Sequence, residues 1–176
     1  MKTFDEILSA AFADADLSAA DVPRIDLYMD QILTLVDEGL AGNKRSAGDK
    51  LLTRTMVNNY SKEHLIMPVK GKKYSREQVM QLLCILVLKQ QLALSDIKKL
   101  VAGEGTPCGF ERAYGEALAL KNRLRPKLEA LLREELSDAP GLDGRERALA
   151  LTLALAGAAT ELRRVCEGVV DSFPEG

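Results

Sequence analysis

The sequence predicts a mainly α-helical protein, on the grounds of its composition, the spacing of its apolar residues and its helix-capping patterns. Aromatic residues are only 5% of the 176 residues and Trp is absent, while Leu and Ala are abundant. Such a composition favours helices over sheets. Patterns of Ser or Thr followed three residues later by Glu or Gln, at Thr3 and Ser75, are typical of helix starts. A chain of this length can bury one good core or two small ones.

Two helices are predicted in the first 40 residues. The first runs from about residue 4 to residue 13, and residues 17–22 form a short turn or helical piece before Pro23. The second runs from Ile25 to Leu40. Its buried side is predicted from helical spacing to contain Ile25, Leu27, Tyr28, Ile32, Leu35 and Val36.

After a polar loop at residues 41–49, a third helix is predicted from Thr53 to about Glu63. Leu52, Met56 and Tyr60 line up on one face, and the opposite face is polar and cationic. His64 follows at a position that often needs a left-handed backbone. The chain then leaves in extended form because Pro68 disfavours helix before it, turns at residues 69–71, and returns. The expected result is a small β-hairpin over residues 65–74.

The second half of the chain is predicted to be entirely helical. Residues 76–91 are apolar around almost the whole circumference, which predicts a fully buried helix, and a short helix ends near Val101. The Gly- and Pro-containing residues 103–109 mark a boundary. Two long helices, at about 110–136 and 145–170, form a C-terminal helical hairpin, and Pro126 is expected to kink or split the first. The predicted organisation is an N-terminal arm (1–22), a central domain (23–103) and a C-terminal helical pair (104–176).

Charge is strongly segregated along the chain. Residues 1–43 hold two basic and nine acidic residues, giving −7. Residues 44–76 hold nine basic and two acidic residues, giving +7, and the remainder has 13 basic and 15 acidic residues. A basic middle in a chain of net charge −2 indicates a local anion-binding surface.

No pattern of catalytic, metal-binding or cofactor-binding residues is present. His64 is the single histidine, and Cys84, Cys108 and Cys166 are too far apart for a metal knuckle or a disulfide framework. An acidic run near the N-terminus is expected to be a solvated face, with a metal or acid/base site as the alternative; it comprises Asp14, Asp16, Asp21, Asp26 and Asp30. The N-terminus has acids inside its apolar run, unlike a signal peptide, and no apolar run is long enough to span a bilayer. We therefore expect a cytoplasmic protein that is not an enzyme and binds no cofactor or metal.

The basic segment favours binding to double-stranded DNA. Lysines and arginines gain affinity for phosphates by counterion release, and a helix fits the major groove, where Arg and Asn suit base edges. Arg54 and Asn58 are four residues apart and project from one helix face, while the hairpin lysines would contact the phosphate backbone. The predicted DNA-binding residues are Arg54, Asn58, Ser61, Lys62, Lys70, Lys72, Lys73 and Arg76.

Residues 51–101 resemble the MerR-type winged helix-turn-helix. The similarity lies in Thr55-Met56 with Tyr60, then Leu65-Ile66 with Pro68, Tyr74-Ser75, and the segment Leu94 to Leu100. The chain is also similar, over about residues 22–103, to a bacterial domain-of-unknown-function family (number 1836). The residues that carry this second similarity are 25–31, 52–60 and 72–76. The resemblance implies a winged helix-turn-helix domain with a small β-hairpin wing and a role in transcription regulation.

Three functions are compatible with this pattern. The leading hypothesis is a DNA-binding regulator that dimerises through its C-terminal helices, because two half-sites improve affinity and specificity. The alternatives are a protein–protein interaction module that docks an acidic partner on the same fold, and a sensor that binds a small ligand between the C-terminal helices.

Overall fold

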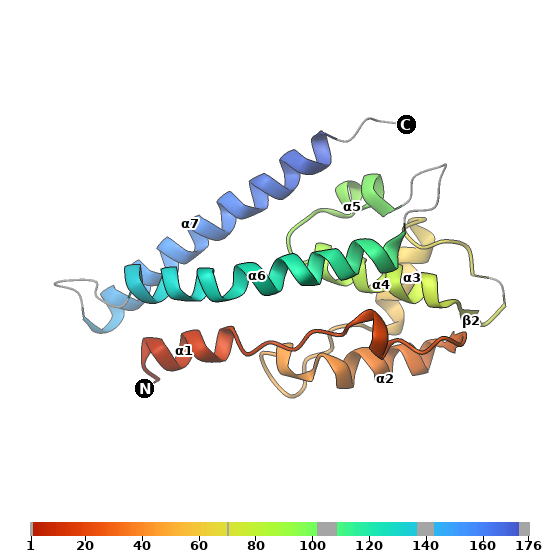
Figure 1. The fold of residues 1–176 in the computed structure, drawn as a ribbon, viewed down its shortest axis with the longest axis horizontal. Coiled ribbons are helices and arrows are strands. Elements are labelled where there is room, and N and C mark those ends of the chain that lie inside the picture. Colours follow the sequence, from red (N-terminus) through yellow and green to blue (C-terminus); the bar gives the residue numbers. More distant parts are fainter. Residues whose placement is uncertain (1, 70, 102–108, 137–142, 173–176) are drawn as a thin grey trace.

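A computed structural model describes residues 2–69, 71–101, 109–136 and 143–172 of the chain. In these ranges the protein is mainly helical with a small two-stranded antiparallel sheet, as predicted (Figure 1). The elements in order are α1 (Phe4–Ala11), η1 (Ala19–Asp21), β1 (Leu27–Tyr28), α2 (Met29–Gly39), η2 (Ala41–Asn43), α3 (Arg54–Lys62), β2 (Lys73–Tyr74), α4 (Arg76–Leu88), α5 (Leu94–Val101), α6 (Phe110–Leu136) and α7 (Gly144–Asp171).

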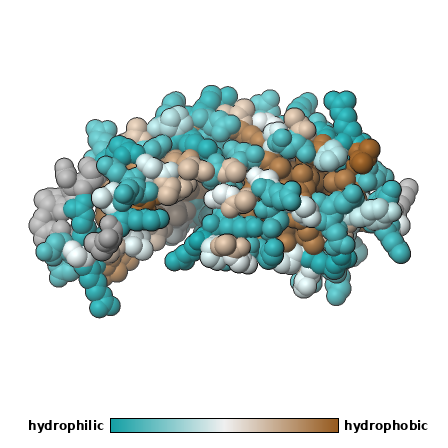
Figure 2. All heavy atoms as spheres, turned by 90° about the horizontal axis from the view of Figure 1, so that it is seen from below, coloured by the Kyte–Doolittle hydropathy of each residue, from teal (hydrophilic) through white to brown (hydrophobic). Residues whose placement is uncertain are grey.

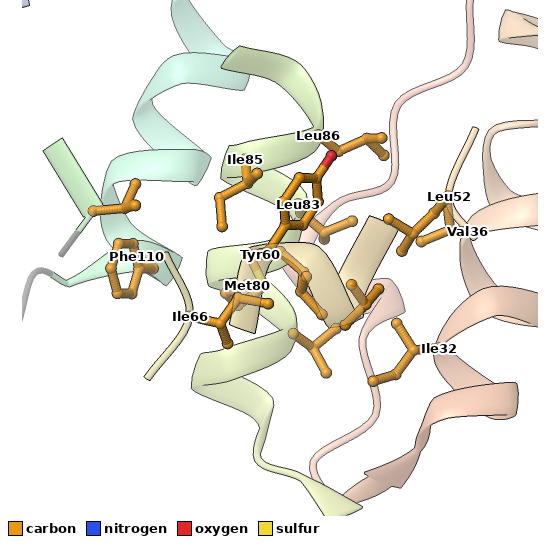
Figure 3. Packing of buried hydrophobic residues seen from close by; sticks show 14 of the residues in the cluster. Ile32, Val36, Leu52, Tyr60, Ile66, Met80, Leu83, Ile85, Leu86 and Phe110 are labelled. Atoms are coloured by element: carbon orange, nitrogen blue, oxygen red, sulfur yellow. The ribbon is translucent and has the colours of Figure 1, made fainter. Parts of the chain in front are cut away.

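Helix α4 lies at the centre of the hydrophobic core. Its apolar residues are buried as predicted, except for the partly buried Cys84 and Leu88 and the exposed Val87, and the helix ends at Leu88 rather than near residue 91. Side chains from α2, α3 and α6 meet those of α4 (Figure 3). The core extends beyond the predicted central domain, because Phe110 and Tyr114 of α6 and Val170 of α7 are buried in the same cluster. Tyr60 of α3 is 3% exposed, and its hydroxyl has no hydrogen-bond partner among the described residues.

The helix ends follow the predicted capping chemistry. Thr3 and Ser75 each form a capping box, and the Thr53 hydroxyl accepts a hydrogen bond from the Met56 amide at 3.2 Å. His64 has φ of 56°, the left-handed conformation expected at this position. There the Leu65 amide donates to the Tyr60 carbonyl at 2.9 Å, the closing bond of a Schellman motif. Both ends of α3 are therefore fixed.

The predicted β-hairpin over residues 65–74 is wrong. Strand β2 pairs instead with β1, with Leu27 opposite Tyr74 and Tyr28 opposite Lys73. Residues 65–69 form no strand, because side chains of α4 occupy their backbone hydrogen-bonding groups. We call the small sheet of β1 and β2, together with the turn at residues 71–72, the wing. The wing is thus built from segments that are far apart in the sequence.

Gln78 and Gln81 of α4 hold the segment from Leu65 to Pro68, and we call these contacts the glutamine clamp. Gln81 is 1% exposed; it accepts from the Met67 amide at 2.9 Å and donates to the carbonyls of Leu65 and Val101 at 2.9 and 3.0 Å. Gln78 donates to the carbonyls of Met67 and Pro68, each at 3.0 Å. Its side-chain oxygen also accepts from the Ser75 amide at 2.8 Å. Buried polar groups are thereby paired, as a stable core requires.

Helix α2 begins later than predicted, at Met29 rather than Ile25. The preceding residues form β1, and the Tyr28 amide donates to the Gln31 side chain at 2.9 Å, which fixes the start of the helix. The predicted burial of Ile25 and Tyr28 is wrong, since they are 67% and 49% exposed. Period-3.6 spacing does not apply to an extended segment, whose side chains alternate between two faces.

The C-terminal helices are long, and Pro126 does not split α6. The N-terminal arm lies along α6, where Lys121 contacts Asp14 and Asp16 at 2.5 and 2.6 Å and Arg125 contacts Asp14 at 2.6 Å. Helix α7 diverges from α6 in Figure 1 and packs with its C-terminal end against α5.

Replacing Gln81 with Met should destabilise the fold by about 3 kcal/mol, because two buried backbone carbonyls and one partly buried amide lose their partner while the side-chain volume is conserved. Chemical denaturation measures the change. Gln91→Met, the same substitution at an exposed position, is the control and should shift stability by less than about 0.5 kcal/mol. Equal effects of the two substitutions would show that the clamp contributes nothing.

Candidate nucleic-acid interface

The exposed face of α3 carries the four predicted contact residues of this helix. Arg54, Asn58, Ser61 and Lys62 are all exposed, whereas Val57 and Tyr60 are buried. Arg54 and Lys62 lie about 12 Å apart along the helix, given a rise of about 1.5 Å per residue. The Ser61 hydroxyl donates to the Val57 carbonyl at 3.1 Å, so this side chain lies along its own helix. Val57 is a core residue that the predicted apolar face of Leu52, Met56 and Tyr60 omitted.

Arg54 forms an ion pair with Asp30 at the start of α2. Both side chains are more than half exposed, and exposed pairs contribute little to stability. A phosphate or a base edge could therefore replace Asp30 at small cost. Arg54 also lies near Tyr74 of β2, since its positive charge opposes the rise that burial causes in the pKa of the Tyr74 hydroxyl.

The wing contributes two exposed lysines, Lys72 and Lys73. The Lys73 ammonium lies 4.9 Å from the ring centroid of Tyr28, its pairing partner in β1. The sequence analysis missed Tyr28 as a surface residue, because it placed Tyr28 on the buried side of a helix that would begin at Ile25. Arg54, Asp30, Tyr28 and Lys73 thus connect the N-terminal end of α3 to the wing.

Arg76 is held by four hydrogen bonds within the protein. Its Nε and one terminal nitrogen each donate to a carboxylate oxygen of Glu111 at 3.0 Å. The same terminal nitrogen donates to the Ala19 carbonyl at 2.7 Å, and the other donates to the Val22 carbonyl. Arg76 therefore connects α4 to η1 and to the start of α6, and we leave it out of the proposed interface.

Two further basic residues form ion pairs within the protein. Lys44 and Lys50 contact the Asp37 carboxylate of α2 at 2.7 and 3.4 Å, and the hydrogen bond from Lys44 lowers the pKa of Asp37. The predicted contact Lys70 lies outside the described residues. We define the basic surface as Arg54, Asn58, Lys62, Lys72 and Lys73, the predicted contacts that are exposed and face outward from α3 and the wing.

Aspartates of the acidic run near the N-terminus lie at several separate places, where they form ion pairs or hydrogen bonds within the protein. Asp14 and Asp16 pair with α6, Asp30 pairs with Arg54, and Asp21 accepts hydrogen bonds from the Ser18 amide and hydroxyl at 2.8 and 2.6 Å. Among the described residues no three His, Cys, Asp or Glu side chains cluster as a metal site would require.

Two open hollows follow α2 and are lined partly by the carboxylates of Asp16, Asp21, Asp30 and Glu38. Figure 2 shows the face on the side of α1 and α2, where hydrophilic residues cover most of the surface and hydrophobic ones gather toward the end that holds the core.

A family model described as Domain of unknown function (DUF1836) matches residues 17–112. The match covers more than half of the chain, so the protein belongs to this family. It includes η1, the wing, α3 to α5 and the first residues of α6, and therefore both Arg76 and its partner Glu111. No curated protein and no solved structure matches the chain.

Within the described ranges, none of the helices has the length and apolar character needed to cross a membrane.

The Arg76–Glu111 pair should make stability depend on acid pH. The hydrogen bond and charge of Arg76 lower the pKa of Glu111 from its ordinary value of 4.5. The stabilisation is therefore present above pH 4.5 and is lost as the pH falls through the lowered pKa of the folded state. Glu111→Gln should flatten this part of the profile of unfolding free energy against pH. Glu116→Gln, at an exposed position of α6, should leave the profile as in the wild type. Identical profiles for all three proteins would contradict the assignment.

Proposed function

We propose that this protein is a DNA-binding transcription regulator of the MerR-like winged helix-turn-helix type, with α3 in the major groove and the wing lysines on phosphates. The observation that carries the proposal is the exposed polar and cationic face of a short helix that is capped at both ends. Arg and Asn on that face have the geometry to read base edges, and the lysines suit the backbone. The resemblance of residues 51–101 to MerR-type domains supports the same assignment.

In this proposal, binding affinity comes mainly from the lysines and selectivity from α3. On binding, Arg54 would leave Asp30 and contact DNA instead. The ion pair would then form only in the DNA-free protein. The protein would bind as a homodimer through its C-terminal helices, so that two copies of α3 contact two half-sites.

Fluorescence anisotropy with labelled random duplex DNA tests the proposal. Affinity should fall steeply between about 50 and 200 mM salt, because counterions released from phosphates oppose binding. Charge reversal of both Lys72 and Lys73 should weaken binding to all sequences and reduce the salt slope by about 2 per chain. Arg54→Ala should instead relax sequence preference, by about 1–3 kcal/mol at one base pair, once a site has been selected.

Reversal of Lys89 and Lys98, two exposed lysines of the α4 C-cap and α5, is the matched control and should leave the salt slope unchanged. Folded protein that binds no DNA at the lowest salt would overturn the proposal. It would favour the alternative of a protein–protein interaction module with an acidic partner.

A further inference from the structure

The middle of α7 is apolar around its whole circumference, and yet none of its residues is buried. The run Ala148–Thr160 contains no charged residue, and none of its residues is buried. A helix that is hydrophobic on all sides is normally buried on all sides. Among the described residues of α7, Val170 alone is buried; it packs into the core close to Asp171, which lies 3.6 Å from Lys99 of α5.

One face of α7 also carries a regular heptad pattern. Apolar residues follow each other at alternating intervals of four and three, the spacing that keeps a seam facing a partner helix. They are Leu151, Leu155, Ala158, Leu162, Val165 and Val169. We call this set the α7 seam. Leu162 and Val165 are 60% and 65% exposed, while the small residues Ala154, Ala159 and Gly168 flank the seam and allow a close approach.

Helix α6 presents a second exposed stripe. Leu120, Leu124, Leu128 and Leu131 share one face and are between 39% and 61% exposed. The adjoining side of α6 is occupied, because Tyr114 lies in the core and Lys121 and Arg125 pair with the N-terminal arm. The stripes of α6 and α7 thus stay open in the described part of the chain.

The solvent-accessible area of the chain is larger than expected for a monomer of its mass, and this favours a partner that covers part of it. The chain exposes 12032 Å². A folded monomer of 19.2 kDa is expected to expose about 8,400 Å², so the excess is about 3,600 Å². A stable interface of standard size buries about 800 Å² on each partner, and obligate homodimers bury more.

We propose that a second copy of this chain covers the α7 seam and the leucine stripe of α6, forming a symmetric helical bundle. A heptad seam is complementary to an identical seam, because the knobs of one helix fit the holes of the other. Charge favours the same occupant, since α7 contains four basic and four acidic residues and two copies do not repel each other. The contact supplies the dimer of the proposed function but does not depend on DNA binding.

Sedimentation equilibrium of the full chain without DNA tests this contact. We expect a mass of twice 19.2 kDa over a wide range of concentration. Leu155→Glu combined with Leu162→Glu should weaken the dimer by at least about a hundredfold, because charges would enter the apolar seam. Arg164→Glu, at an exposed position on another face of α7, is the control and should leave the mass unchanged.

Leu155→Ala with Leu162→Ala distinguishes a lost contact from a lost helix, because Ala is the best helix former. This variant should also weaken the dimer while circular dichroism shows unchanged helix content. A wild-type mass of 19.2 kDa at all concentrations would overturn the proposal, as would full dimerisation of both seam variants. Charge reversal of Lys72 and Lys73 should weaken DNA binding but leave the protein dimeric, which separates this test from that of the proposed function.

Discussion

The hydrogen bonds of the glutamine clamp are the constraint on which the rest of the structure depends. Gln78 and Gln81 are buried polar residues of α4 that bind the backbone of residues 65–68. This segment leaves α3 in a direction that its sequence alone does not determine. Gln81 also donates a hydrogen bond to the Val101 carbonyl, the last described carbonyl of α5. Because an unpaired buried amide is costly, α4, α5 and the segment after α3 must form together.

The clamp also positions the basic surface. Gln78 closes the capping box at Ser75, directly after β2, so the strand that carries Lys73 is tied to α4. The Schellman turn at His64 and the clamp immediately after it place α3 over the same helix. A charged face can bind a rigid polyanion with defined geometry only if its residues are held relative to one another. The contacts with α4 therefore determine the distance between Arg54 and Lys73 as much as the basic segment itself does.

Features that depend on local chemistry were predictable from the sequence, and those that depend on distant pairing were not. The capping boxes at Thr3 and Ser75 and the turn at His64 follow from neighbouring residues. The β1–β2 pairing joins Leu27 to Tyr74, and nothing in either short segment identifies the other. Two signals were usable: glutamines three residues apart in an apolar helix, and Arg76 at a helix start, where the helix dipole disfavours a cation unless it has a partner.

Amide hydrogen exchange at Met67 tests the clamp most directly. This amide lies in a segment without regular secondary structure, and its hydrogen-bond acceptor is the Gln81 side chain 2.9 Å away. If the clamp fixes the segment, the Met67 amide exchanges as slowly as the interior amides of α4, because both open only when the core opens. Exchange at the rate of an exposed loop amide would contradict the clamp and, with it, the fixed position of α3 relative to the wing.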